Sequence, residues 1–286
     1  MRDTRKMGMR TLFMMALAIT ALVFGSISPA SAGEKKIDLA LCAPTQVFTI
    51  DIDNPYILYS PVGRQWRLVG EEDDEIIIVR ITVLDETETL YPGTFNVLTR
   101  VVEELEAVDE NEDGFIQNDE VIEQSFNYYA QRTADDTLCY FGEEVWEPAE
   151  EEVFALFDNG DEPVPGEVVD GLERNEEGEW RADEGMASSP GVFFPASDDA
   201  LPGTKFQQEN GPPDALDEMK IVGSGSVLLE DVTIDGVAME DVTFEDVRRG
   251  REFNPVDGDK GYKTFARGVG IILDEDFQIK ETGVLP

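Results

Sequence analysis

A run of ten residues at positions 75–84, EIIIVRITVL, constrains the fold more than any other part of this chain. In an extended strand, successive side chains alternate between the two faces, so apolar groups here fall on both sides. One face carries Ile77, Val79, Ile81 and Val83, and the other carries Ile76, Ile78, Arg80, Thr82 and Leu84. A strand that is apolar on nearly both faces is typical of the centre of a sheet.

Further strand-like stretches follow at short intervals, separated by turns rich in Gly, Pro and Asp. They span residues 46–52, 65–69, 94–108, 121–131, 137–141, 153–157, 179–181, 190–195, 219–234, 263–266 and 271–279, and residues 242–253 are either extended or partly helical. The pattern predicts a mainly β fold, an antiparallel sheet or partly open barrel built from hairpins with little helix. No Pro/Gly break isolates a segment able to fold alone, so residues 33–286 are expected to form a single domain.

The first 32 residues have the pattern of a secretory signal peptide. Basic side chains precede an apolar run at residues 11–24, and small residues follow at 30–32. No later segment approaches about 18 uninterrupted apolar residues, the length that a membrane-spanning helix needs. We expect a secreted or periplasmic protein that is not inserted in a membrane once the leader is cleaved.

The chain is very acidic, with 62 Asp and Glu against 22 Lys and Arg and a formal net charge of −40. Such a charge repels nucleic acid and anionic lipid and attracts cations or basic surfaces. It is also compatible with simple solubility in a salty medium. The chain contains no His, which excludes His-based catalytic triads and His-ligated zinc.

Cys42 and Cys139 are the only cysteines of the chain. In an oxidising compartment, two cysteines most simply form one disulfide, which here would tie the N-terminal arm to the middle of the chain. Two unpaired buried thiols are the alternative, because sequence spacing does not fix the geometry of a bridge.

Residues 109–120, DENEDGFIQNDE, match the calcium-binding loop of an EF-hand at every diagnostic position. The predicted ligands are Asp109, Asn111, Asp113, the Phe115 carbonyl, Gln117 and a bidentate Glu120. Gly114 permits the unusual backbone turn, and Ile116 offers an apolar anchor beneath the loop. Calcium takes six to eight oxygen ligands, which this set can supply. The alternative is a solvated acidic turn with no ordered ion.

The sequence around the loop allows two interpretations. Apolar residues recur at helical intervals on both sides of it, whereas Thr, Phe and Val at residues 94–102 favour a strand. We expect strands to dominate, with at most a helical turn or two touching the loop. A single loop without a paired hand also argues against a regulatory switch.

Other patterns have simpler explanations. Residues 71–75 and 158–162 are acidic but lack the calcium spacing, so solvated turns are expected there. Trp66, Trp146 and Trp180 could form a carbohydrate platform, but core packing is the simpler role. Valines at every fifth position from 232 to 247 resemble a short pentapeptide-repeat coil, although the repeats are few for a stable solenoid.

Four stretches together resemble a family of uncharacterised secreted bacterial proteins. They are IDNPYILYSPVGRQW at 52–66, NYYAQRTADDTLCYFGEEV at 127–145, SPGVFFPA at 189–196 and ARGVGIILDED at 266–276. The resemblance implies an antiparallel β architecture and carries no settled activity. In that family a short Gly-containing turn precedes the YAQ strand, whereas this chain has the acidic loop there.

The sequence therefore predicts an exported acidic protein in which one Ca²⁺ orders the loop at residues 109–120. An alternative is a calcium-dependent surface or adhesion module that binds an envelope or matrix partner. A third hypothesis is a carboxylate-based hydrolase, for which no particular pair of acids can be chosen among so many. The first two hypotheses do not make the protein an enzyme, and we favour them.

Overall fold

The computed structural model describes residues 33–72, 74–148, 161–176, 179–185, 188–213, 215–256 and 258–284. In this part of the chain one 16-stranded sheet contains all the strands, and two 3₁₀ turns, η1 (Leu39–Cys42) and η2 (Asn118–Glu120), are the helical elements. The strands are β1 (Lys35–Lys36), β2 (Phe48–Thr49), β3 (Arg64–Glu72), β4 (Glu75–Leu90), β5 (Val97–Val108), β6 (Val121–Arg132), β7 (Leu138–Pro148), β8 (Leu172–Arg174), β9 (Trp180–Arg181), β10 (Gly191–Phe194), β11 (Thr204–Gln207), β12 (Glu218–Ile234), β13 (Val237–Phe253), β14 (Tyr262–Ala266), β15 (Gly270–Asp274) and β16 (Phe277–Val284).

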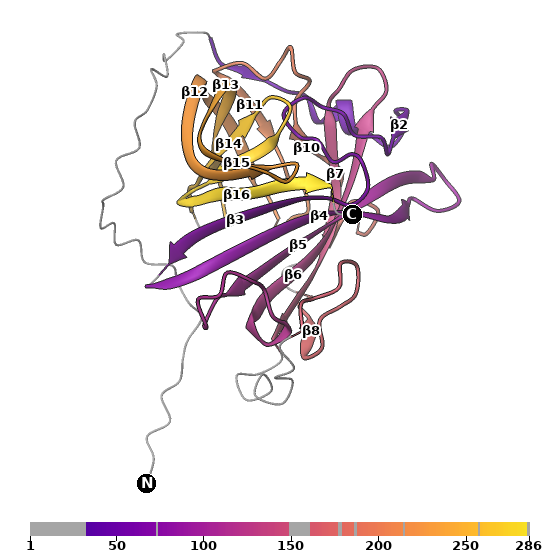
Figure 1. Cartoon of the computed structure of the whole chain (residues 1–286). Coiled ribbons are helices and arrows are strands. Elements are labelled where there is room, and N and C mark those ends of the chain that lie inside the picture. The colour runs from indigo at the N-terminus through magenta and orange to yellow at the C-terminus, as the bar shows by residue number, and fades with distance from the viewer. Residues whose placement is uncertain are drawn as a thin grey trace.

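The predicted mainly β, antiparallel fold is confirmed. Across the sheet the order is β1-β11-β12-β13-β14-β15-β16-β3-β4-β5-β6-β7-β10, with β2 beside β6 and with β8 and β9 beside β7. The run β16-β3-β4-β5-β6 can be followed across the middle of Figure 1. Pairs along this order are antiparallel except β1 with β11. Most neighbouring strands are consecutive in the chain and form hairpins, as the turn spacing predicts, whereas β16 pairs with β3 and β7 pairs with β10 across longer stretches of sequence.

The two ends of the sheet approach each other beside β10 and β11. The Ser189 N–H donates to the Asn210 carbonyl at 3.0 Å, and Gln208 Nε2 donates to the Phe193 carbonyl at 3.2 Å. A Cβ at Gly191 would lie 1.7 Å from the Gln208 oxygen, so only glycine permits this close approach. The sheet therefore curls into a partial ring, and we call the interior of this ring the lumen.

Strand β4 lies between β3 and β5, in agreement with its predicted central place. Ile81 and Val83 belong to the main hydrophobic core, which fills much of the lumen. Ile78, by contrast, packs on the outer face of the ring in a second core that includes Leu105 and Ile116. Both faces of this strand are thus buried, as its alternating apolar residues require.

Aromatic side chains dominate the main core. Phe194 contacts Phe206 and Phe265 with ring centroids 6.0 Å and 5.0 Å apart, in the edge-to-face geometry that aromatic pairs favour. Trp66 and Trp180 are 1% and 6% exposed, so they pack inside rather than forming a surface platform for sugars. Burying each such side chain contributes about 1.5–3 kcal/mol to folding.

A disulfide joins Cys42 and Cys139, with the Cα atoms 5.5 Å apart and a separation of 97 positions in the sequence. It ties η1 to β7, and both cysteines are fully buried. The predicted pairing is confirmed, and it is consistent with export to an oxidising compartment. Residues 1–32, the predicted signal peptide, lie outside the described residues.

The C-terminal third corrects two details of the sequence analysis. β12 and β13 form one long curved hairpin (Figure 1), with φ of 47° at Asp235 and 75° at Gly236 in its turn. Positive φ at both turn residues is the I′ geometry that fits strand twist, so the recurring valines belong to a hairpin and the coil of repeats is wrong. The single strand expected at 271–279 is divided between β15 and β16 by a turn at Glu275, where φ is 49°.

The strand predicted at residues 153–157 lies outside the described residues. Within the described ranges, no helix has the length and apolar character needed to cross a membrane.

Candidate functional site: the acidic loop and the lumen

The acidic loop at residues 109–120 connects β5 to β6, so strands flank it as predicted, with the η2 turn at its end. Its first residue is held by the sheet, because the Asp109 N–H donates to the Ile76 carbonyl at 2.8 Å. Asp109 is 5% exposed and Glu120 is 7% exposed. Two carboxylates are therefore buried at the two ends of one short connection.

Asp109 and Asn111 fold the first half of the loop back on itself. The Asp109 carboxylate accepts the N–H of Asp113 at 3.1 Å and the N–H of Gly114 at 2.9 Å. Asn111 Oδ1 accepts the same Asp113 N–H at 2.8 Å. Gly114 has a φ of 80°, the left-handed conformation predicted for the sixth position of the loop.

The second half is closed by Gln117 and Glu120. The Glu120 carboxylate accepts the Gln117 N–H at 3.1 Å, and Gln117 Nε2 donates to Asp113 at 3.1 Å. Asp113 also accepts the Phe115 N–H at 2.9 Å. Five of the six predicted ligands are thus linked by hydrogen bonds through their side chains, and the sixth, the Phe115 carbonyl, comes from the same turn.

Burial of the loop changes the acidity of Glu120. Burial is the main cause that raises the pKa of the Glu120 carboxyl, and the charge of Asp109 adds to it, whereas the Gln117 N–H works in the opposite direction. The apolar side chain of Ile116 is 4% exposed in the second core, as its predicted role as an anchor requires. Phe115 is 65% exposed and does not contribute to that core.

The donor set fits calcium by chemistry, since carboxylate, amide and carbonyl oxygens are the ligands that this hard cation takes. In the geometry described, side-chain oxygens of four of these residues accept N–H groups of the loop itself, namely Asp109, Asn111, Asp113 and Glu120. Within the described ranges, no group of three or more His, Cys, Asp or Glu side chains is clustered so that it could hold a metal ion. Calcium would have to exchange some of the loop's hydrogen bonds for coordination.

One cation already lies beside the loop. Arg67 of β3 donates from Nη2 to the Gly114 carbonyl, an oxygen that is not among the predicted ligands. The guanidinium links the turn to β3, which is separated from β5 by β4, and among the described contacts it forms no direct ion pair with the ligand side chains. The sequence pattern did not indicate this contact, because β3 is distant from the loop in the chain.

A second group of acids lines the lumen and was missed by the sequence analysis. Lys263 of β14 lies 3.3 Å from Glu252 of β13 and 3.3 Å from Asp274 of β15. Across the ring, burial raises the pKa of Glu104 on β5 to about 7 and that of Glu143 on β7 to about 8. The lumen therefore brings Glu104, Glu252 and Asp274, from three different strands, around one lysine.

These groups are not sealed from water. The Lys263 and Asp274 side chains are 28% and 27% exposed, yet protein surrounds them closely because they lie on a concave surface. Burial works against the charge of Lys263, but Asp274 and Glu252 outweigh it and hold the Lys263 pKa above its ordinary value. A cavity of about 30 Å³ adjoins Glu104, Lys263 and Asp274, with Trp66 in its wall.

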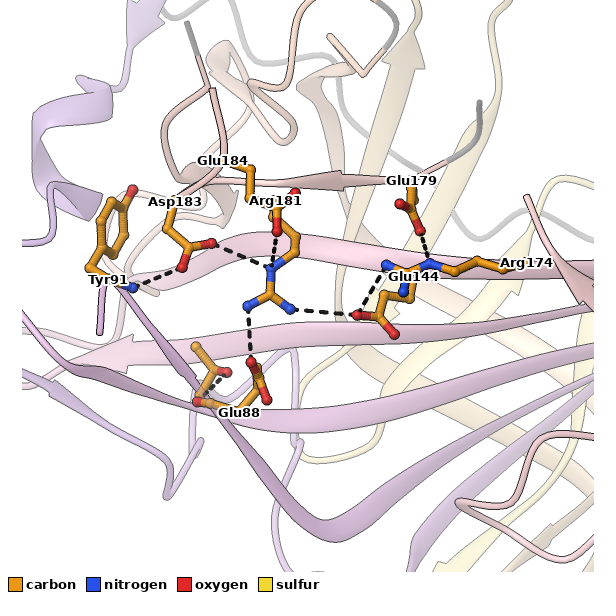
Figure 2. Close-up of polar contacts among 9 residues, drawn as sticks. Glu88, Tyr91, Glu144, Arg174, Glu179, Arg181, Asp183 and Glu184 are labelled. Atoms are coloured by element: carbon orange, nitrogen blue, oxygen red, sulfur yellow. Dashed lines mark hydrogen bonds and ion pairs between the residues drawn. The ribbon is translucent and has the colours of Figure 1, made fainter. Parts of the chain in front are cut away.

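The segment that carries β9 is attached to the ring by an ion-pair network around Arg181 (Figure 2). Arg181 lies 2.9 Å from Glu88, 3.4 Å from Asp183 and 3.5 Å from Glu144, and Arg174 lies 3.3 Å from Glu144. Each of these carboxylates contacts a guanidinium. The network therefore attaches the β9 segment to the ring, and its acids are used in ion pairs.

The other predicted acidic clusters are turns or partners of basic residues. Glu71, Glu72, Asp74 and Glu75 are exposed at the turn between β3 and β4. Glu162 lies 3.2 Å from Arg80, and residues 158–160 lie outside the described residues. Asp161 of the second cluster contacts the acidic loop through its backbone, because its carbonyl accepts the Asn118 N–H at 3.1 Å.

Comparison with family models, with curated proteins and with solved structures finds no match to this chain. The family resemblance stated above stays a prediction, and the function has to be argued from the residues of the chain itself.

Proposed function

We propose that this chain is an exported acidic protein whose loop at residues 109–120 binds one Ca²⁺, which orders the β5–β6 hairpin. The observation that carries the proposal is the burial of Asp109 and Glu120, 5% and 7% exposed, at the two ends of a turn that already contains Asn111, Asp113 and Gln117. Calcium would neutralise two carboxylates whose mutual repulsion contributes to the raised pKa of Glu120.

The energetic role follows from mass action. An extracellular calcium loop has a dissociation constant of about 10⁻⁴–10⁻³ M, so only an environment with millimolar calcium fills it. A ligand present at about 100 times its dissociation constant stabilises the folded state by about 2.7 kcal/mol. Ile116 connects the loop to the second core, so an ordered loop also holds the outer face of β4 and β5.

Thermal unfolding tests the proposal directly. The melting temperature of the wild type is expected to rise by several degrees between EGTA and about 10 mM calcium, because only the folded loop binds the ion. Glu120→Gln is expected to abolish this rise, since it removes the bidentate ligand. Glu110→Gln makes the same charge change at an exposed loop position that is not a ligand, and it should keep the rise.

An equal melting temperature with and without calcium in the wild type would contradict the proposal. So would a rise of the same size in Glu120→Gln and Glu110→Gln, because calcium would then be acting on the general negative charge of the protein.

The hydrolase alternative has one observation in its favour and one against it. Glu104 and Glu143 in the lumen have raised pKa values, as an acid catalyst at neutral pH requires. The cavity beside Glu104, however, is only about 30 Å³, which is room for one or two water molecules and not for a sugar ring. We therefore retain calcium binding, with attachment to a surface as the second candidate.

A further inference from the structure

A row of basic side chains crosses the outer face of the sheet. In the strand register, Lys36 of β1 lies opposite Lys205 of β11, Lys205 opposite Lys220 of β12, and Lys220 opposite Arg251 of β13. The next residue in this line is Tyr262 of β14, opposite Arg251. We call the four cations Lys36, Lys205, Lys220 and Arg251 the basic row. With about 4.8 Å between neighbouring strands, the row is about 14 Å long.

The basic row faces away from the lumen. Phe206, Met219 and Ile221 alternate with its residues along β11 and β12 and are 1%, 0% and 0% exposed, so they point to the core. Lys36 and Arg251 are exposed. Tyr262, at the end of the line, is 42% exposed, and the Arg249 guanidinium lies 4.3 Å from the centroid of its ring.

The row is costly to the fold and only partly neutralised. Like charges directly opposite each other on neighbouring strands destabilise a sheet. Glu218 lies 2.5 Å from Lys205, and Glu34 lies 3.0 Å from Lys220. Among the described residues, no ion pair joins Lys36 or Arg251 to a carboxylate. A chain with 62 acidic residues against 22 basic ones thus leaves part of the basic row without a carboxylate partner among the described ion pairs.

A surface hollow lies along the row. Its volume is about 140 Å³, and it is lined by Glu34, Lys205, Glu218, Lys220, Arg251 and Phe253 together with Met219. Lysine and arginine donors bind anionic oxygens through charge-assisted hydrogen bonds, and Arg does so in a bidentate way. An aromatic ring beside them offers an apolar face to the ring of a sugar.

We infer that the basic row binds an acidic polysaccharide, a chain of sugars that carry carboxylate or sulfate groups. The anionic groups lie along Lys205, Lys220 and Arg251, and a sugar ring enters the hollow beside Phe253. The inference concerns a face of the ring separate from the acidic loop and does not depend on calcium binding.

The overall charge of the protein disfavours nucleic acid as the occupant. Duplex DNA carries one charge per about 1.7 Å of its axis and a single strand one per about 3.4 Å, both denser than one cation per about 4.8 Å in the row. The excess charge of a nucleic acid would face the −40 net charge of the chain. A polysaccharide with about one charge per sugar has less excess charge to repel.

Glu34 has a defined place in this inference. Its carboxylate accepts a hydrogen bond from the Lys220 ammonium, and this hydrogen bond lowers the pKa of Glu34. Glu34, in the N-terminal arm, therefore competes with an external anion for Lys220. Replacing Glu34 by Gln should therefore free Lys220 and strengthen polysaccharide binding.

Binding of oligogalacturonate and of chondroitin sulfate to the full chain, measured by fluorescence titration or thermophoresis in EGTA, tests the inference. The wild type should bind at least one of them and not a neutral maltooligosaccharide. Arg251→Gln and Lys220→Gln should each weaken binding about tenfold, the loss expected for a charge-assisted hydrogen bond. Lys280→Gln, with the same charge change on β16, should leave the affinity within about twofold. Glu34→Gln should raise it.

Three results would overturn the inference. The first is no binding of either acidic polysaccharide by the wild type. The second is equal losses in Arg251→Gln, Lys220→Gln and Lys280→Gln, which would mean that only total charge matters. The third is single-stranded DNA binding as tightly as the polysaccharides. Because EGTA is present throughout, failure here leaves the calcium proposal unaffected, and failure of the calcium proposal leaves this one unaffected.

Discussion

Replacing Glu104 by Gln should make the protein more stable at alkaline pH and less sensitive to pH. Glu104 faces the lumen from β5, and burial is the main cause that raises its pKa from 4.5 to about 7, while Lys263 lowers it. In the folded protein this carboxyl therefore keeps its proton in a pH range where the unfolded chain loses it.

The sign of the effect follows from proton linkage. Between pH 4.5 and about 7 the folded state binds more protons at Glu104 than the unfolded state does, so the unfolding free energy falls as the pH rises through this window. A rise of the Glu104 pKa from 4.5 to about 7 corresponds to about 3 kcal/mol. Because water reaches the lumen, this value is an upper limit for the gain in Glu104→Gln above pH 7.

Urea unfolding followed by tryptophan fluorescence between about pH 5 and 8 measures the effect. Wild type and Glu104→Gln should differ little near pH 5, and the variant should become more stable by about 1–3 kcal/mol at pH 8. Glu240→Gln, at an exposed position of β13, removes the same charge and should follow the wild type. A stability that rises from pH 5 to 7 in the wild type, or an equal pH slope in all three proteins, would refute the argument.

Three further predictions concern the scaffold. Replacing Cys42 and Cys139 by Ser should lower the unfolding free energy by about 4 kcal/mol, since the bridge closes a loop of 97 residues, and urea unfolding of the reduced wild type should give a similar loss. Arg80→Met should lower the unfolding free energy by about 3–5 kcal/mol, because the fully buried Glu103 would lose the guanidinium that lies 3.6 Å away. In a double-mutant cycle, adding Glu103→Gln should restore part of this loss. Leu105→Ala should cost about 2–5 kcal/mol in the same assay through a cavity in the second core, and a loss under about 1 kcal/mol would mean that this core packs loosely.

Local sequence patterns were enough to predict the long strands β4, β5, β6 and β12 and the position of the acidic loop, but not the short strands β1, β8 and β11. The apolar alternation of β4 depends only on near neighbours, and the positions of Asp109, Gly114 and Glu120 depend only on spacing within one turn. The Cys42–Cys139 bridge was predictable because the chain has no other cysteine with which to form alternatives. The flanking strands were harder, since apolar residues near the loop fit a helix as well.

The lumen acids could not be found in the same way. Period-two alternation separates Glu103 from Glu104, but it does not say which face becomes concave when the sheet curls. Glu103 joins Arg80 on the outer side, whereas Glu104 faces Lys263 inside. Acidic residues within an otherwise apolar strand were the one feature of the sequence that could have indicated these lumen acids.

The basic row depends on long-range register. Lys36 and Arg251 lie near opposite ends of the chain, and they fall in one line only because β1, β11, β12 and β13 pair in a particular alignment. A shift of one residue in any of these pairs would turn a cation to the other face. Sequence analysis that considers one strand at a time cannot predict such a line.

A crystal structure of the protein grown in millimolar calcium would test the central claim most directly. The account predicts one ion in the loop, about 2.3–2.6 Å from oxygens of Asp109, Asn111, Asp113, Phe115 and Glu120, with Gln117 bound directly or through water. The Asp109 carboxylate would then give up at least one of its hydrogen bonds to the Asp113 and Gly114 N–H groups. A well-ordered loop without an ion at that calcium concentration, with both hydrogen bonds intact, would contradict the account.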